Sequence, residues 1–204
     1  PFVSALSILG MVGIWALVTG SGLVSSRVLP SPADVLETGG RIIRIGYADT
    51  PLLAHIGWSL YRATMGFLLG VVLAVPVGLL MSYNKTTGAT PHPISGFFPT
   101  IPPIAFIPLM IIWFGIGETS KILLIFAASF NYTVLNSAAG MKSVPEQLIR
   151  AGTNLGLTRW QLFTSVMFPA ALPAILTGIK TSAAVSWAVL VAAELIAAQA
   201  GLGF

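Results

Sequence analysis

Five stretches of this chain carry hardly any charge over a length that can cross a lipid bilayer. They cover residues 1–26, 63–84, 86–117, 122–141 and, interrupted only by a lysine, 162–193. Crossing the hydrocarbon core takes about 20 predominantly apolar residues in a helix. Only 8% of all residues are charged, whereas an ordinary soluble domain has about 25%. The sequence therefore predicts an integral membrane protein.

These stretches are expected to form helices. Inside lipid only helices and closed barrels satisfy every backbone polar group, and a barrel would show shorter segments of alternating polarity. We therefore predict an all-α polytopic membrane protein. Its spans are expected at about residues 3–22, 60–83, 94–115, 120–141 and 173–197.

Local signals add detail to two regions. Ser31 and Asp34 have the spacing of a helix cap, so a short surface helix is expected from Pro32 to about Tyr47. The predicted span at 94–115 is rich in proline, which removes a backbone hydrogen bond and kinks a helix. We expect this span to be bent or broken, either because it lines a solute pathway or because it forms a re-entrant bend.

Glycines also mark one face of the second predicted span. Gly66, Gly70 and Gly78 recur at intervals of four and eight residues, which places them on one side of the helix. Small residues in such a row let a neighbouring backbone approach closely. Ordinary packing within a helical bundle is the interpretation we favour for this row.

Few residue types suited to catalysis or metal binding are present. The chain has no cysteine, and its two histidines are His55 and His92. This composition excludes disulfides and thiolate metal sites and nearly excludes a histidine-based site. A G-x-x-x-x-G-K-[ST] phosphate loop is also missing, so any ATP hydrolysis requires another chain. We expect no catalytic residue, no metal site and no cofactor bound by this chain.

A polar connector between residues 142 and 173 has the pattern of helix, turn and helix. Ser143 with Glu146, and Thr158 with Gln161, each show the S/T-x-x-E/Q spacing of a capping box. Two helices are therefore predicted to begin about a dozen residues apart. Gly156 lies where the first helix must end, a position that favours left-handed backbone. Leu157 is expected to pack on Leu162 across the second helix start.

This connector resembles the loop that defines permease subunits of ABC importers. The family pattern is Glu-Ala-Ala, three residues, Gly, nine residues, Ile-x-Leu-Pro. Here it reads Arg150-Ala151-Gly152, then Gly156, then Val166-Met-Phe168-Pro169. The spacing holds throughout, and Ala151, Gly156 and Pro169 match by identity. Arg150 and Gly152 depart from the usual glutamate and second alanine, which puts a glutamate-mediated contact in doubt and leaves the turn intact.

Further stretches are similar to the nitrate, sulfonate and taurine group of these permeases. They lie at residues 29–32, 102–117 and 172–178, while residues 113–125 and 190–204 look most like taurine permeases. The resemblance implies the type I importer permease fold, with six spans of which about five are present. The resemblance also implies that residues 1–204 form a single transmembrane permease domain, with a cytoplasmic coupling loop at 143–168. We expect this domain to be incomplete at both ends.

The resemblance also implies a function and a set of partners. The chain would be the non-catalytic transmembrane subunit of an ATP-driven importer of taurine or a related sulfonate, in the bacterial inner membrane. Two cytoplasmic ABC ATPase subunits would bind ATP and magnesium, a second permease copy would complete a homodimer, and an extracytoplasmic binding protein would deliver the substrate. No nucleic acid is expected as a partner. Nitrate, bicarbonate or a thiamin precursor remain alternative substrates, and an ion-coupled secondary transporter is the alternative of another class.

Two sets of site residues follow. The ATPase-coupling residues implied by the family pattern are Arg150, Ala151, Gly152, Leu155, Gly156, Leu157, Thr158, Arg159 and Pro169. An amphipathic helix lying on lipid is the alternative for this segment. Polar or aromatic side chains within the spans are candidates for the translocation pathway, with interhelical hydrogen bonding as the alternative. They are Asn131, Tyr132, Asn136, Ser182, Ser186, Trp187 and Glu194.

Glu194 is the most demanding of these candidates. A carboxylate in the middle of a bilayer costs about 2.5–3.5 kcal/mol on insertion scales. We therefore expect it to face the bundle, to pair with a cation or to lie near the outer surface, and we favour the last. Arg62 or Lys180 would suit a sulfonate if either lay near the pathway, although each can equally extend to the membrane interface.

Overall fold

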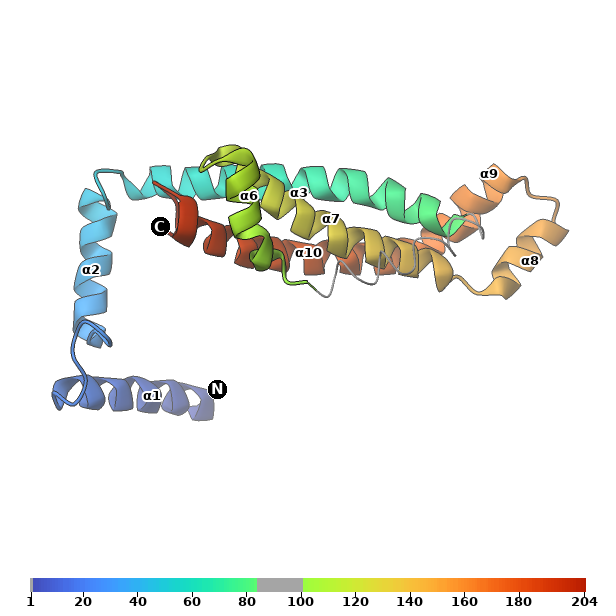
Figure 1. Ribbon diagram of the computed structural model, residues 1–204. Coiled ribbons are helices and arrows are strands. Elements are labelled where there is room, and N and C mark those ends of the chain that lie inside the picture. The colour runs from blue at the N-terminus through green and yellow to red at the C-terminus, as the bar shows by residue number, and fades with distance from the viewer. Residues whose placement is uncertain (1, 84–100) are drawn as a thin grey trace. The chain divides into compact units, whose positions relative to one another are not determined.

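The computed structural model describes residues 2–83 and 101–204, and most of this part is helical (Figure 1). The chain divides into two compact units, Pro1–His55 and Ile56–Phe204. The first half of the chain forms α1 (Phe2–Gly20), α2 (Pro32–Ile45) and α3 (Leu52–Tyr83). The second half forms the 3₁₀ helix η2 (Pro103–Phe106), α6 (Ile107–Phe114), α7 (Glu118–Lys142), α8 (Glu146–Asn154), α9 (Arg159–Leu162), the π-helical turn η3 (Phe163–Met167) and α10 (Phe168–Ala197).

Four helices in the described part are long and apolar enough to cross a membrane. They are Val3–Gly20, Leu52–Ser82, Glu118–Lys142 and Arg159–Ile196. Four of the expected spans are thereby confirmed, and three of them begin earlier in the chain than the hydropathy pattern indicated, at Leu52, Glu118 and Arg159. The start of the fifth, 94–100, lies outside the described residues. Its remainder forms a shorter apolar helix, Pro103–Phe114, in which η2 precedes α6 and Pro108 lies in the first turn of α6. The proline-rich stretch is therefore not one regular α-helix in its described part.

The first unit shows why α2 begins and ends where it does. The Asp34 amide donates to Ser31 Oγ over 3.2 Å, and the Ser31 amide donates to Asp34 Oδ2 over 3.0 Å. The predicted cap is therefore confirmed and takes the form of a capping box, with Pro32 at the first helical position. The hydrogen bonds from Ser31 hold the pKa of the Asp34 carboxyl below its ordinary value. The helix ends at Ile45, two residues before the predicted end, because Gly46 takes a φ of 93°.

In the second unit, α3, α7 and α10 lie side by side as one bundle (Figure 1). The predicted glycine row of α3 faces α7. A Cβ added at Gly66, Gly70 or Gly78 would lie 2.6–2.7 Å from the Cβ atom of Ile125, Ser129 or Ser137, respectively. The glycines therefore allow α3 and α7 to lie so close together that any larger residue at these positions would clash. Because lipid tails are as apolar as these side chains, such close van der Waals contact is a main source of helix association.

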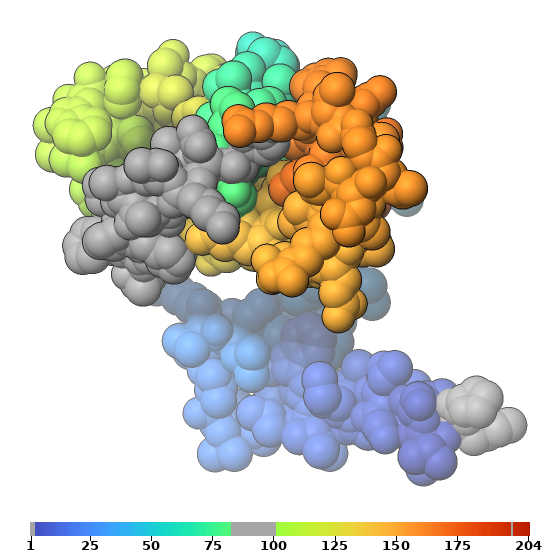
Figure 2. All heavy atoms as spheres, turned by 90° about the vertical axis from the view of Figure 1, so that its right-hand side faces the viewer, coloured from blue at the N-terminus to red at the C-terminus, as the bar shows by residue number. Residues whose placement is uncertain are grey.

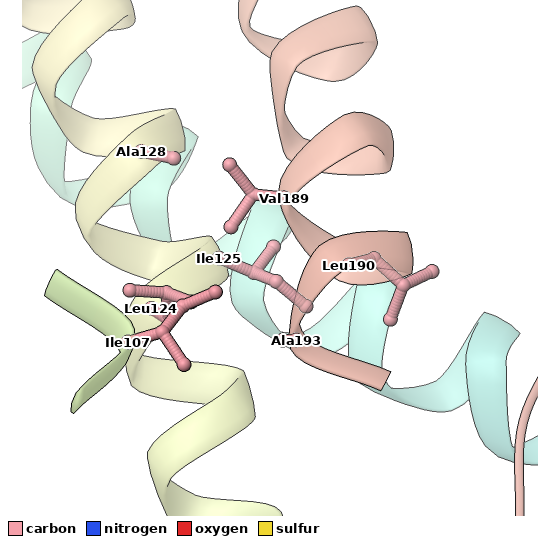
Figure 3. Close-up of a cluster of buried hydrophobic side chains, with 7 residues drawn as sticks. All are labelled: Ile107, Leu124, Ile125, Ala128, Val189, Leu190 and Ala193. Atoms are coloured by element: carbon pink, nitrogen blue, oxygen red, sulfur yellow. The ribbon is translucent and has the colours of Figure 1, made fainter. Parts of the chain in front are cut away.

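Two apolar clusters lie at opposite ends of this bundle. The cluster in Figure 3 joins α6, α7 and α10, and it consists of Ile107, Leu124, Ile125, Ala128, Val189, Leu190 and Ala193. The second cluster, near α8 and η3, consists of Leu79, Met141, Val144, Ala171 and Ile175. The bundle thus has a packed core at each end, and each core supports a different candidate site.

The start of α10 accommodates two prolines. Pro169 lies in its first turn and Pro173 lies inside the helix. A proline has no N–H for the ladder and its ring clashes with the preceding turn. The π-helical turn η3 lies directly before α10, and such a wider turn is a common adjustment to an interrupted ladder. As a result α9, η3 and α10 continue as one helical rod from Arg159 to Ile196.

Candidate functional site

The connector between α7 and α10 lies at one end of the bundle, where α8 and α9 face the reader in Figure 2. Its second predicted capping box is confirmed. The Thr158 amide donates to Gln161 Oε1 over 2.9 Å, and the Gln161 amide donates to Thr158 Oγ1 over 3.4 Å. α9 therefore begins at the predicted residue.

The first predicted capping box is wrong. The Ser143 hydroxyl donates to the Gly140 carbonyl over 2.9 Å, and Ser143 still belongs to the last turn of α7. The N-cap of α8 is Pro145, two residues after Ser143, and it makes no side-chain hydrogen bond. Because Pro145 occupies the N-cap, Glu146 is the first helical residue and cannot complete a box with Ser143.

The turn between α8 and α9 closes as predicted. Gly156 has a φ of 76°, in the left-handed region that glycine adopts most easily. The Leu157 amide donates to the Gly152 carbonyl over 3.1 Å, and the Gly156 amide donates to the Thr153 carbonyl over 3.0 Å. This pair of bonds is the Schellman motif, which satisfies the last carbonyls of α8. The turn is therefore rigidly hydrogen-bonded without needing any partner chain.

Gly152, which departs from the family alanine, is explained by its neighbours. It is the buried residue of α8. A Cβ at this position would lie 2.6 Å from Leu162 Cδ1 and 3.2 Å from Leu157 Cδ1. The two leucines of the connector therefore occupy the space that an alanine methyl group would need. Leu157 and Leu162, which are expected to contact each other, both lie over Gly152.

The predicted coupling residues are mostly at the surface. Arg150 and Glu146 form an ion pair of 3.0 Å with both side chains 73% exposed. Leu155 is 82% exposed and Leu148 is also exposed, whereas Ile149 packs against the second apolar cluster. The remaining exposed members are Ala151, Gly156, Thr158, Arg159 and Pro169, and Leu157 is half-buried.

Trp160 belongs to this surface and was not predicted. Its side chain is 72% exposed, and its ring stacks on Phe163 at a centroid distance of 5.8 Å. A large aromatic side chain two residues after the capping residue Thr158, in a loop between spans, was the available signal. Leu148, Leu155 and Trp160 are therefore three large apolar side chains that the connector exposes.

The predicted pathway residues of α7 and α10 lie in different surroundings. The Thr133 hydroxyl donates to Ser182 Oγ over 3.0 Å between α7 and α10, which is interhelical bonding. Asn136 donates to the Tyr132 carbonyl of its own helix over 2.8 Å. Asn131 instead lines an apolar cavity of about 510 Å³ with Phe126 and Phe130.

The two remaining candidates of α10 differ sharply from each other. Ser186 is buried and its hydroxyl has no hydrogen-bond partner among the described residues. Trp187 is exposed on the outside of α10. The structure therefore keeps Ser186 as a polar group inside the bundle and places Trp187 on its surface.

Glu194 lies at the other end of the bundle and is fully buried. The Arg62 Nη1 group donates to Glu194 Oε1 over 2.7 Å, and the Ser59 hydroxyl donates to both carboxylate oxygens over 2.7 and 2.9 Å. Of the three expectations for Glu194, facing the bundle and pairing with a cation are confirmed, whereas the favoured one, a position near the outer surface, stays a prediction. Because both charges are buried, removing one partner alone is expected to cost several kcal/mol.

The Gly-Leu-Gly-Phe segment after α10 wraps around this carboxylate. The Gly203 amide donates to Glu194 Oε2 over 2.9 Å, and the Leu202 amide donates to Ser59 Oγ over 2.8 Å. A Cβ at Gly201 would lie 2.5 Å from Glu194 Oε1. The glycines are therefore needed for the backbone to come this close to a buried carboxylate.

Two more charged residues complete a cluster that sequence reasoning missed. Arg62 contacts both oxygens of Glu118 through Nε and Nη2, the latter over 2.8 Å, and Lys121 Nζ donates to Glu118 Oε1 over 3.0 Å. Arg62, Glu118, Lys121 and Glu194, with Ser59, are called the charge cluster below. It contains two positive and two negative groups and joins α3, α7 and α10.

A cavity of about 360 Å³ lies beside the charge cluster. It is lined by Trp58, Arg62, Ile116, Gly117, Glu118, Lys121, Gln199 and Ala200. The Arg62 Cζ atom lies 5.8 Å from the centroid of the Trp58 ring, within range of a cation–π interaction. The described residues contain no group of histidine, cysteine and carboxylate side chains that could hold a metal ion.

Comparisons with known proteins agree with this architecture. Residues 66–204 match the family described as binding-protein-dependent transport system inner membrane component. The taurine transport system permease protein TauC of Escherichia coli K12 is 42% identical over 198 residues, which cover 95% of this chain and 71% of that protein. The putative aliphatic sulfonates transport permease protein SsuC of Bacillus subtilis 168 is 37% identical, over 95% of this chain and 69% of that protein.

A third relative and a solved structure extend the comparison. The nitrate import permease protein NrtB of Synechocystis sp. PCC 6803 is 32% identical, over 98% of this chain and 74% of that protein. A chain in an inward-facing structure of the MetNI methionine ABC transporter has a TM-score of 0.63 at 22% identity, over 74% of this chain and 76% of that chain. The likeness to MetNI shows the fold, which is that of type I importer permeases.

Family membership settles several expectations together. Proteins of this family are non-catalytic, multi-pass membrane components of ABC transporters that work with ATPase subunits. The described helices, the connector and the sequence matches all agree with that description. This chain belongs to the family of binding-protein-dependent transport system inner membrane components.

Proposed function

We propose that this chain is the membrane-spanning subunit of an ATP-driven importer of taurine or a related sulfonate in the bacterial inner membrane. The observation that carries the proposal is the 42% identity to a taurine permease along 95% of the chain. Similarity to an aliphatic sulfonate permease at 37% supports the same class of substrate. In this function 1–204 is one transmembrane permease domain, and the solute crosses between its spans and those of a second copy.

The connector 143–168 is the proposed cytoplasmic coupling loop. Exposed Leu148, Leu155 and Trp160 would lie in a groove of an ABC ATPase, and the Schellman turn at Gly156 would transmit its movement to α10 through α9. Two ATPase subunits would bind ATP and magnesium, and an extracytoplasmic binding protein would deliver the solute. Asn131 and Ser186 are the pathway candidates that best fit this function, because Asn131 lines a cavity and the Ser186 hydroxyl has no hydrogen-bond partner in the part of the chain that the structure describes.

Nitrate is the second candidate substrate. The 32% identity to a nitrate permease over 98% of the chain supports it. Sulfonate and nitrate are both small oxyanions, so the same cationic groups could serve either. Bicarbonate and thiamin precursors have no comparable support among these relatives.

ATP-dependent uptake of radiolabelled taurine into vesicles containing the complete complex tests the proposal. The informative variant is Gly156→Asp, which introduces a strained residue and a charge on the connector. Gly115→Asp is the matched control, because Gly115 has a nearly equal φ of 75° and, like Gly156, open space around its Cβ position. We expect uptake to be lost in Gly156→Asp with assembly preserved, and retained in Gly115→Asp.

The other outcomes separate the parts of the proposal. Uptake of nitrate or an alkanesulfonate in place of taurine keeps the mechanism and rejects the substrate. Equal uptake by the wild type and Gly156→Asp rejects the coupling role of the turn. Uptake that continues without the ATPase subunits rejects the ATP-driven mechanism.

A further inference from the structure

We propose that Arg62 and Lys121 form a binding site for a small oxyanion, and that Glu118 fills this site with its own carboxylate until the oxyanion displaces it. The site faces the cavity of about 360 Å³ beside the charge cluster. This inference rests on the proposed function and assigns the permease a direct contact with its solute. A sulfonate or another small oxyanion is the chemical class that the site would take.

Arg62 is held in an orientation suited to such a ligand. Its Nη1 group is fixed by Glu194 Oε1 and by the Ala200 carbonyl, each over 2.7 Å. The opposite edge, formed by Nε and Nη2, contacts the two oxygens of Glu118. A guanidinium binds planar or tetrahedral oxyanions in a bidentate manner through this kind of edge. The buried contacts of Nη1 keep the edge in place when its partner changes.

Glu118 is the member of the charge cluster that can leave. Its side chain is 40% exposed, whereas Arg62 and Lys121 are 2% and 5% exposed and Glu194 is fully buried. A carboxylate that is already partly hydrated can turn toward water by breaking only its ion pairs, whereas an enclosed carboxylate would also need the packing around it to open. Glu118 is also the shared acceptor of both cations, so its departure frees both at once.

The cavity offers room and suitable walls. Its volume falls within the roughly 300–1,000 Å³ range of small-molecule sites. Arg62, Lys121 and Glu118 all line it, together with the indole of Trp58 and the amide of Gln199. The apolar ring can contact the carbon chain of an organic sulfonate, while the two cations contact its oxygens. An oxyanion in place of Glu118 also restores the balance of two positive and two negative groups.

The proposal predicts opposite effects for two neighbouring variants. Glu118→Gln removes the competing carboxylate, so oxyanion affinity should rise about three- to tenfold. Lys121→Gln removes a cation of the site, so affinity should fall by roughly tenfold. If the cluster only held the helices together, neither variant would strengthen binding. Lys180→Gln is the matched control, because Lys180 is an exposed lysine of α10 away from the lining of this cavity.

The measurement is a fluorescence titration of the full-length permease bound to its ATPase, with ethanesulfonate as the probe. Trp58 lies over Arg62 and should report occupancy, and Trp58→Phe identifies its share of the signal. The binding protein is left out because it would take up the probe. Titration in detergent and in phospholipid nanodiscs distinguishes a solute sulfonate from a lipid phosphate.

Each outcome has a definite meaning. Tighter binding by Glu118→Gln, weaker binding by Lys121→Gln and unchanged binding by Lys180→Gln, in both detergent and nanodiscs, support the site. Weaker or unchanged binding by Glu118→Gln overturns it, and so does binding that is lost in nanodiscs, which assigns the cations to a lipid headgroup. Wild-type uptake of sulfonate is measured in parallel. Uptake without the predicted binding pattern rejects only this site, whereas the absence of uptake of any sulfonate or nitrate rejects the proposed function.

Discussion

The two ends of the α3–α7–α10 bundle use an arginine–glutamate pair in opposite ways. At the connector, Arg150 and Glu146 lie 3.0 Å apart and are both 73% exposed. At the charge cluster, Arg62 and Glu194 lie 2.7 Å apart and are 2% and 0% exposed. An exposed pair of this kind contributes about 0.3–0.5 kcal/mol, whereas breaking a buried pair costs about 3–5 kcal/mol. The ion pair of the connector can therefore be broken at a small cost in free energy. The buried pair of Arg62 and Glu194 instead holds α3 and α10 together at the opposite end.

The largest expected effect is on the buried pair. Arg62→Met leaves Glu194 buried without its cation and should lower stability by about 3–5 kcal/mol. Arg150→Met, its counterpart at the connector, should lower it by less than about 0.5 kcal/mol. Thermal unfolding of the purified permease–ATPase complex in detergent measures both changes.

A double variant sharpens this first prediction. Arg62→Met combined with Glu194→Gln removes the unpaired charge, so part of the lost stability should return. Equal losses for Arg62→Met and Arg150→Met would show that burial does not separate the two ends.

A smaller effect is expected from the loop that encloses Glu194. Gly201→Ala places a methyl group against the carboxylate, where Cβ would lie 2.5 Å from Oε1, at a φ of 156°. The strain should cost about 1–3 kcal/mol in the same unfolding measurement. Gly39→Ala is the control, because a Cβ there has nothing within 4 Å. A Gly201→Ala variant as stable as the control would mean that the loop does not press on Glu194.

The corresponding change at the connector should matter less. Gly152→Ala brings a methyl group within 2.6 Å of Leu162 Cδ1, the end of a flexible side chain that can turn away. We expect a loss below about 1 kcal/mol in thermal unfolding. A loss as large as that of Gly201→Ala would show that the connector is packed as tightly as the charge cluster.

The features that could be predicted were those that depend on neighbouring residues in the sequence. The α2 cap, the Thr158–Gln161 box and the left-handed Gly156 depend on residues within a few positions of one another, and each confirmed span depends on one continuous apolar run. The Ser143 box failed because Pro145 took the N-cap position, a competition between two start signals that spacing alone does not decide.

The charge cluster could not be predicted in the same way because its members are far apart in the chain. Arg62 reaches Glu118 and Glu194 across sequence separations of 56 and 132 residues. The sequence showed that each charge would need a partner inside a membrane, and it did not show which. One usable signal was the position of Glu118 and Glu194 at the start of one span and the end of another, since these ends meet when the two helices are antiparallel.

The smallest expected effect concerns the two capping boxes, of which only one contains an acid. The hydrogen bonds from Ser31 lower the pKa of Asp34 in the folded chain, so the ionised form stabilises the start of α2 at neutral pH. This contribution is lost as the pH falls through the Asp34 pKa, below about pH 4. Gln161 fills the equivalent place at the start of α9 and does not titrate.

Because the chain has no cysteine, single variants Thr38→Cys and Thr164→Cys can each carry one spin label. Acidification should raise label mobility at position 38 before position 164, and Asp34→Asn should remove that difference. The same response at both positions would point to general acid unfolding and not to the cap.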